Sequence, residues 1–200
     1  LALELLPTQP LLLQGDDGFS RKGPEERHAS HYYSQPQLAA AARISLAGRR
    51  IDATGRAWLD HEWSDEVLAA DAVGWDWIGF NLFDGSALTA FQLRRADGSA
   101  LWAGGSHRRA ADQARNFQPR ELQWTPGRRW RSPSTGASYP VQWRLDTPVG
   151  AFTVRALLDP QELDGRQGTG TVYWEGLSEL VDGAQRRVGL GYLEMTGYSG

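Results

Sequence analysis

Hydrophobic and polar residues alternate with a period of two along most of the chain, and Gly, Asp or Pro interrupts the alternation at short intervals. This pattern is typical of β-strands that bury one face, whereas the longer period of amphipathic helices is scarce. Short helical or loop segments are predicted only at 64–72 and 110–116. The alternation predicts strands at residues 38–47, 49–60, 73–83, 87–95, 99–107, 119–125, 140–146, 150–158, 170–181 and 185–197.

Turn-forming dipeptides separate several of these strands. Asp84-Gly85 and Asp97-Gly98 are strong hairpin signals, and Ala47-Gly48 and Asp182-Gly183 occupy equivalent places. About ten short strands at regular spacing predict an all-β fold, an antiparallel barrel or sandwich with at most short helical segments.

The first 36 residues differ in composition from the rest. Residues 1–6 alternate like a strand, and the following PTQPLLLQGDDGFSRKGPEE is rich in Pro, Gly and charge. Residues 1–36 are therefore predicted to be the end of a preceding domain and a linker, and residues 37–200 a barrel domain. Because the chain shows neither an initial Met nor a signal-peptide pattern, we expect it to be part of a longer protein.

Composition and charge narrow the classes of function. The formal net charge is −3 without a long basic or acidic run, so electrostatics give little support to nucleic-acid binding. No apolar segment approaches the length of a membrane span, and the absence of Cys removes disulfides, thiol catalysis and Cys-based zinc sites. Lysine is nearly missing and arginine supplies the cationic side chains, while nine Trp and 23 Gly are many for this length.

The stretch AWLDHEW at residues 57–63 places two carboxylates and a histidine side by side. A zinc-protease helix needs two His four residues apart, but Asp65 stands where the second His would be. Neighbouring side chains of a strand point to opposite faces, so Asp60, His61 and Glu62 cannot close around one ion. We therefore expect no metal site and no cofactor.

Two other chemistries find weak support in the sequence. Residues 104–107 read GGSH but lack the helix and the final glycine of a nucleophile elbow, although a Ser–His–carboxylate set assembled in space stays open. The glycine-rich residues 165–170 precede a strand rather than a helix, which removes the helix N-terminus that phosphate sites use.

Strand alternation groups the remaining candidate residues by face. His61 shares a face with Trp63, and Trp174 and Glu175 lie on opposite faces of their strand. The other two groups are Trp75 with Trp77 and Asn81, and Tyr192 with Glu194 and Thr196. Tryptophans of this kind fill a barrel core, with Asp, Glu and His satisfying one another at the rim. Alternatively, they line a small-molecule pocket in which a titratable group moves protons.

Several long motifs resemble one family. GRAWLDHEWS, GWDWIGFNLFDGSALTAFQLRRADG, YWEG and GLGYLEMTGY are similar to those of the AttH-type proteins, which carry a secreted-hydrolase label and belong with the lipocalin-like carotenoid 1,2-hydratase group. The resemblance covers essentially the whole chain. It implies a pair of lipocalin-like β-barrels, of which this chain holds the second and the tail of the first. It also implies a secreted or periplasmic protein, sometimes lipid-anchored, associated with an ABC transport system.

The resemblance also implies site residues. The hydratases use a His and a Trp in an H-x-W arrangement, which falls here on His61 and Trp63. They also use a Tyr and an Asp two residues apart, and the comparable place around residues 91–93 has neither. An acid that protonates a C=C bond is then a hypothesis for another strand, with Glu62, Glu175 and Glu194 as candidates.

Two classes of function follow from this reading. In the first, the protein hydrates or cyclises a large apolar, terpenoid-like molecule, with His61, Glu175 and Glu194 as catalytic residues. In the second, it is a carrier for a lipid-like molecule, and the same tryptophans only line its pocket. The ligand-binding residues expected in both cases are Trp63, Trp75, Trp77, Asn81, Gln92, Trp174 and Tyr192. A His–carboxylate pair that points into the cavity favours the enzyme.

Overall fold

A computed structural model describes residues 1–65, 68–110, 112–167 and 170–199 as an all-β fold. One 3₁₀ turn, η1 (Pro119–Glu121), accompanies the strands. The strands are β1 (Ala2–Leu6), β2 (Leu12–Leu13), β3 (Phe19–Arg21), β4 (Ala29–Leu46), β5 (Arg49–Trp63), β6 (Gly74–Leu82), β7 (Ala87–Arg94), β8 (Ala100–Arg108), β9 (Arg115–Phe117), β10 (Gln123–Pro126), β11 (Arg129–Arg131), β12 (Ser138–Pro140), β13 (Gln142–Thr147), β14 (Gly150–Ala156), β15 (Glu162–Asp164), β16 (Val172–Asp182) and β17 (Arg187–Thr196).

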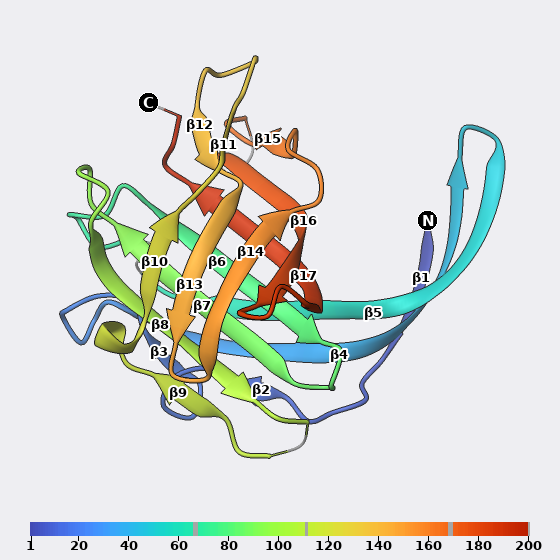
Figure 1. The fold of residues 1–200 in the computed structure, drawn as a ribbon, viewed down its shortest axis with the longest axis horizontal. Coiled ribbons are helices and arrows are strands. Elements are labelled where there is room, and N and C mark those ends of the chain that lie inside the picture. The colour runs from blue at the N-terminus through green and yellow to red at the C-terminus, as the bar shows by residue number, and fades with distance from the viewer. Residues whose placement is uncertain (66–67, 111, 168–169, 200) are drawn as a thin grey trace.

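The main sheet is a curled antiparallel half-barrel. Nine strands follow one another in the order β10-β13-β14-β16-β17-β6-β7-β8-β9, and β15 pairs with β16 beside this path. Its two edge strands are joined along the chain by η1, and the curl is visible in Figure 1. The predicted all-β fold is confirmed, and each of the ten predicted strands overlaps an observed one.

The short connecting segments differ from their predictions. The strand predicted at 119–125 begins with η1, because Pro119 starts a turn that Glu121 closes. The segment 110–116 forms no helix in its described part, since β9 begins at Arg115; residue 111 lies outside the described residues. Segment 64–72 consists of turns and bends where it is described, and residues 66–67 lie outside that part.

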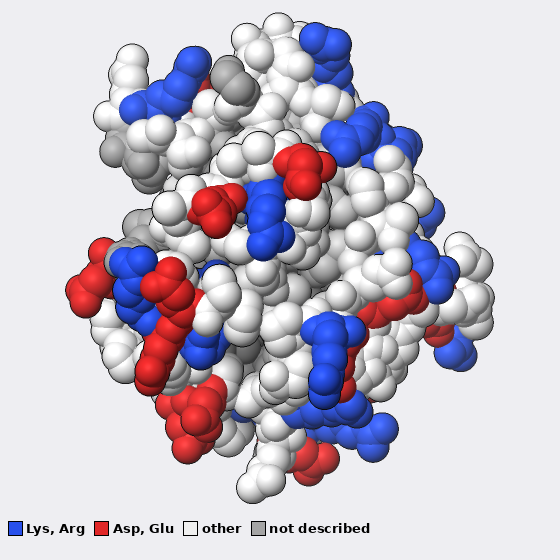
Figure 2. All heavy atoms as spheres, turned by 90° about the vertical axis from the view of Figure 1, so that its left-hand side faces the viewer, with Lys and Arg blue, Asp and Glu red and all other residues white. Residues whose placement is uncertain are grey.

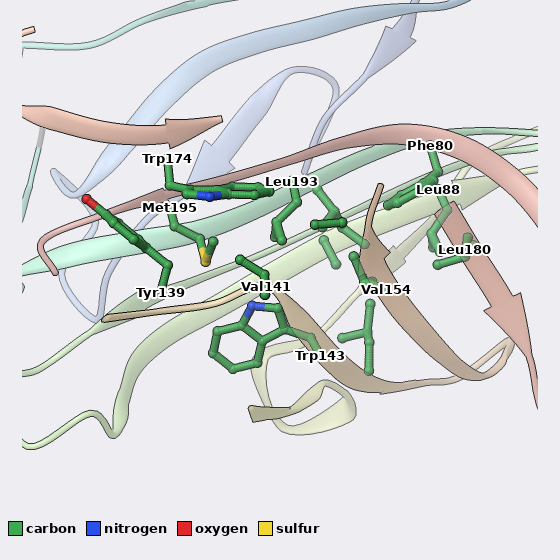
Figure 3. Close-up of a cluster of buried hydrophobic side chains, with 14 of the residues drawn as sticks. Phe80, Leu88, Tyr139, Val141, Trp143, Val154, Trp174, Leu180, Leu193 and Met195 are labelled. Carbon is green, nitrogen blue, oxygen red and sulfur yellow. The ribbon is translucent and has the colours of Figure 1, made fainter. Parts of the chain in front are cut away.

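The concave side of the half-barrel is filled by side chains (Figure 3). On β6, Ile78 and Phe80 alternate with residues that point the other way, and both are fully buried in this core. Trp174 of β16 lies among them, and its Nε1 donates to the carbonyl of Asp159 at 2.7 Å. Packed interiors of this kind leave little room for a ligand, so a site must be sought on the opposite face of the sheet.

A second sheet lies against that opposite face. The β4–β5 hairpin is its centre, and β1, β2 and β3 pair with β4. At the bulge between Gln35 and Leu38, Gln37 adopts φ 56° and its backbone N–H donates to Asn81 Oδ1 of β6 at 2.7 Å. Its side-chain Nε2 donates to the carbonyls of Leu82 at 3.0 Å and Ser86 at 2.9 Å. These bonds fix the hairpin across the main sheet.

The segment predicted as a linker packs tightly on the same body. Gln14 is buried, and its Nε2 donates to Ser34 Oγ at 2.9 Å and to Thr89 Oγ1 at 3.1 Å. Ser106 Oγ donates to Gln14 Oε1 at 2.8 Å, which closes a network between β4, β7 and β8. Residues 9–35 are therefore held to the barrel by buried polar bonds.

The far half of the β4–β5 hairpin, together with β1, projects from the body as a curved arm (Figure 1). Its register places apolar residues on one face: Leu3 pairs with Ala42, and Ile44 pairs with Ile51. Leu3 is 52% exposed and Ile51 41% exposed. The arm thus presents an apolar surface that the described residues do not cover.

A buried ion pair holds the core-facing side of β6 to its neighbours. Asp76 is 0% exposed, and its Oδ2 lies 2.8 Å from Arg94 Nε and accepts a bond from Gln92 Nε2 at 2.8 Å. Tyr198 Oη donates to Asp76 Oδ1 at 2.8 Å, and the Arg94 guanidinium lies over the Tyr198 ring at 4.0 Å. Burial raises the pKa of Asp76, and Arg94 is the main group that opposes the rise.

We expect Asp76→Ala to destabilise the fold by about 3–5 kcal/mol, because it leaves the Arg94 charge buried without its partner. Urea unfolding followed by circular dichroism measures this change. The control is Asp146→Ala, which removes the partner of Arg144 in a surface pair at 2.8 Å. We expect a much smaller change there, and equal losses in both variants would contradict the importance of burial.

Candidate functional site

A cavity of about 460 Å³ lies between the β4–β5 hairpin and the outer face of the main sheet. Aromatic and aliphatic side chains form most of its wall, and six polar side chains reach it. The apolar lining residues are Tyr32, Trp63, Leu68, Trp75, Trp77, Phe91 and Leu93. The polar lining residues are Lys22, Ser30, Asp60, Glu62, Ser64 and Glu194. An apolar cavity with a few converging polar groups is typical of small-molecule sites.

The alternation of β5 points Asp60 into the cavity. Its Oδ1 accepts bonds from Ser34 Oγ at 2.5 Å and from Tyr32 Oη at 3.0 Å. Trp77 Nε1 in turn donates to Tyr32 Oη at 3.1 Å. Burial raises the pKa of Asp60, and the bonds from Ser34 and Tyr32 oppose the rise. Burial also raises the pKa of Tyr32, with the Asp60 charge as the next cause.

Lys22 enters the cavity from the segment that follows β3. Its Nζ lies 2.8 Å from Glu62 Oε1 and sits over the rings of Phe91 at 4.1 Å and Tyr32 at 4.7 Å. Ser30 Oγ donates to the same Glu62 oxygen. Burial lowers the pKa of the Lys22 amine, and the Glu62 charge opposes this effect.

The carboxyl group of Glu194 is strongly affected by its surroundings. Trp75 Nε1 donates to Glu194 Oε1 at 2.6 Å, and Glu175 stands directly opposite on β16 in the strand pairing. Burial raises the pKa of Glu194 to about 7, and the Glu175 charge adds to the rise while the Trp75 bond opposes it. At neutral pH Glu194 therefore exists in both its acid and its carboxylate form.

A second cavity of about 830 Å³ adjoins the first along the hairpin. Asp60, Trp77 and Glu194 line both cavities, so these three residues stand between them. Gly79 lies beside them, and a Cβ there would come 2.4 Å from the Trp77 ring and 3.1 Å from Trp58. Glycine is thus required for the two indoles to meet edge to face, with ring centres 6.5 Å apart.

The structure brings several of the sequence-predicted residues together at these cavities. Trp63, Trp75, Trp77 and Glu194 line the first. The second is lined by Asn81, Glu175, Tyr192 and Glu194.

Three predicted residues lie elsewhere. His61 is exposed on the other face of β5, where Tyr33 Oη lies 2.9 Å from its Nδ1 and its ring centre lies 5.0 Å from that of Trp63. Gln92 and Trp174 point to the core side of the main sheet, to the Asp76 ion pair and to the hydrophobic core respectively. His61 therefore contacts the cavity wall through Trp63 without lining the cavity.

Sequence reasoning missed Lys22 and Tyr32 and considered Asp60 only as a metal ligand. The residues at 58, 60 and 62 share one face of β5, and that face meets the cavity. The signal for Lys22 was present in the composition, since the chain has one lysine in 200 residues.

Among the described residues, no group of three or more His, Asp or Glu side chains is arranged to hold a metal ion. No helix in the described part is long and apolar enough to cross a bilayer.

The surface of the face that Figure 2 presents mixes both signs of charge. Lys and Arg side chains stand beside Asp and Glu, and most of this face carries neither. Close surface pairs such as Arg166 with Asp164 at 2.6 Å and Arg128 with Asp159 at 2.9 Å follow the same pattern. A mixed surface produces no large field of one sign on this side.

The half-barrel with its covering hairpin defines an all-β protein with a barrel-like fold and an aromatic cavity. The chain belongs to the AttH-like family, whose model matches residues 1–198. A crystal structure of an AttH protein from Nitrosomonas europaea is 48% identical, with a TM-score of 0.94, and the match covers 99% of this chain and 62% of that one.

Kievitone hydratase from Nectria haematococca has the same fold. It is 18% identical, with a TM-score of 0.77, and the match covers 98% of this chain and 60% of that chain. The present chain thus spans about three fifths of the length of both solved structures. A comparison with curated proteins finds no match.

We expect Glu194→Gln to change how stability depends on pH. Because burial raises the Glu194 pKa from 4.5 to about 7, the folded protein holds a proton that the unfolded chain loses in this interval. This group therefore stabilises the fold fully below pH 4.5, and the contribution is lost as the pH rises to about 7. Relative to the wild type, the variant gains on the order of 3 kcal/mol across that interval.

Urea unfolding at a series of pH values measures this difference. Glu4→Gln is the matched control, because Glu4 is an exposed carboxyl on β1. If the Glu194 and Glu4 variants follow the wild-type pH profile alike, Glu194 is not the proton-binding group.

Proposed function

We propose that the paired cavities bind a large apolar, unsaturated molecule and that Glu194 supplies the proton for addition of water to one of its C=C bonds. The observation that carries this proposal is a carboxyl group with a pKa of about 7, held by the Trp75 indole against a wall of aromatic rings. A general acid works best when its pKa lies near the operating pH.

The walls suit the positive charge that such a reaction creates. When Glu194 gives its proton to one carbon, the neighbouring carbon becomes electron-poor. The faces of indole rings attract positive charge, and Trp75 and Trp77 line the cavity beside Glu194. Water then adds to the electron-poor carbon, and its surplus proton passes to a carboxylate, for which Asp60 on the opposite wall is available.

The length of the site favours a long ligand. The two cavities meet at Asp60, Trp77 and Glu194, so a molecule that occupies both presents its middle to the acid. Kievitone hydratase, which shares the fold, is named for the addition of water, and this makes hydration the first reaction to test. In this proposal His61 acts through Trp63, whose ring it contacts, and not on the ligand.

Location and partners complete the proposal. A secreted or periplasmic protein that works beside an ABC transport system would handle such a ligand outside the cytoplasm. The apolar face of the arm, with Leu3 and Ile51 exposed, is the surface that a preceding lipocalin-like domain would cover. Both statements follow from the family resemblance and from that apolar face.

We expect the uncharged dye N-phenyl-naphthylamine to bind the cavity with a rise in fluorescence. Trp77→Leu removes a ring that lines both cavities and weakens dye binding about tenfold, equivalent to about 1.4 kcal/mol. Trp130→Leu is the control, because Trp130 packs on the core, away from both cavities. Dye binding that is absent, or equally weakened by both changes, contradicts a ligand site at this place.

The hydration step has its own measurement. The protein is incubated with farnesol, an unsaturated isoprenoid alcohol, and products heavier by one water are sought by mass spectrometry. We expect Glu194→Gln to abolish the product while dye binding persists. Dye binding without any hydrated product in the wild type would instead support the carrier function.

A further inference from the structure

The chain contains one lysine, Lys22, among 21 basic residues, the others being arginine. Arginine is the cation of surface ion pairs such as Arg128 with Asp159 and Arg155 with Glu179. The one lysine is largely buried, with 16% of its side chain exposed, and it lines the candidate site. The use of lysine at this one place, in the cavity, indicates a chemical role that arginine cannot fill.

Lysine and arginine carry the same charge, but they differ in whether the side chain can act as a nucleophile. Guanidinium keeps its proton in proteins and is not a nucleophile, whereas an amine that loses its proton attacks carbonyl carbon. Burial in the cavity lowers the pKa of the Lys22 amine and so favours its neutral form, while Glu62 and the faces of the Phe91 and Tyr32 rings hold the nitrogen in place. Glu62, 2.8 Å away, is placed to take the proton that the amine must lose.

The geometry points to Lys22 as a covalent anchor that binds an apolar aldehyde or ketone as an imine. The ligand's carbonyl end lies at Lys22 and Glu62, and its hydrocarbon part lies along Trp75, Trp77 and Leu93. This inference rests on the proposed function, because the imine requires an apolar molecule in the cavity. It specifies in addition that this molecule carries a carbonyl group.

The reaction balances with the groups present. The Lys22 ammonium gives a proton to Glu62, and the amine nitrogen forms a bond to the carbonyl carbon while the carbonyl electron pair moves to oxygen. The protonated Glu62 returns its proton to that oxygen, which gives a carbinolamine with a positively charged nitrogen. Glu62 then takes one proton from this nitrogen, which frees the nitrogen lone pair, and passes the proton to the hydroxyl group. The hydroxyl group leaves as water while the lone pair forms the C=N bond, and the product is a protonated imine. Glu62, oriented by Ser30 Oγ, then stands beside the positive nitrogen as its counter-ion.

The test uses citronellal, an apolar isoprenoid aldehyde, with sodium cyanoborohydride to trap any imine. The test protein consists of residues 1–200, so its amines are the Lys22 side chain and the α-amino group of Leu1, a residue that is 86% exposed. Peptide mapping by mass spectrometry separates the two. We expect Lys22 to carry the adduct in preference to Leu1, and an excess of N-phenyl-naphthylamine to suppress labelling of Lys22 alone.

Lys22→Arg is the matched variant, because it keeps the positive charge beside Glu62 and cannot form an imine. We expect it to be labelled only at the N-terminus, and circular dichroism shows that the variant is folded. Labelling of the wild type only at Leu1, or labelling of Lys22 that the dye does not change, overturns the inference. Dye binding is measured on the same sample. If the dye binds and Lys22 stays unlabelled, the result contradicts the imine at Lys22 but not the proposed ligand site. If the dye does not bind, the proposed ligand site fails as well.

Discussion

The site depends on the docking of a polar hairpin face onto the outer side of a β-sheet. The bulge at Gln37 turns its backbone N–H toward Asn81 and its side chain toward the turn after β6, and the Gln14 network ties the preceding segment to β7 and β8. Between these two attachments the hairpin spans the sheet, and the aromatic side chains of both layers keep it at a distance. The cavity is the space that these rings leave, and the carboxyl groups of β5 and β17 are enclosed there by necessity.

The two faces of the main sheet show how the fold treats buried acids differently. On the core side, Asp76 is fully buried and receives an ion pair and two hydrogen bonds, which is the usual condition for a stable buried charge. On the hairpin side, Glu194 receives one indole N–H and faces a second carboxyl, Glu175. Among the described residues, the charges that act most on the Glu194 pKa are those of Glu175 and Asp60, and both are negative. An acid without a compensating cation costs stability above its ordinary pKa, and such a cost is common where a group is used for chemistry.

The strands could be predicted from the sequence because alternation and turn dipeptides are local signals. The hairpins at Asp84-Gly85 and Asp97-Gly98 follow directly, since glycine takes the positive φ that the turns require, 85° and 83°. The site was harder to predict, because alternation tells which residues share a face of a strand but not which face another sheet covers. His61 and Trp63 do share a face, but the cavity lies mainly on the side of Asp60 and Glu62. Trp63, the last residue of β5, also lines it, whereas His61 does not. The pairing of β4 with β5 across a bulge, which decides this, depends on contacts between distant residues.

Lys22 and Glu194 are driven toward their neutral forms by the same surroundings. Burial lowers the pKa of the amine and raises that of the acid, and each effect reflects rings in place of water. A ligand that fills the cavity removes the remaining water and strengthens both effects together. In our two proposals the amine attacks and the acid donates a proton, and the pKa shifts that favour these roles have one cause. Both follow from the apolar space between the hairpin and the sheet, and we expect an apolar occupant to strengthen both.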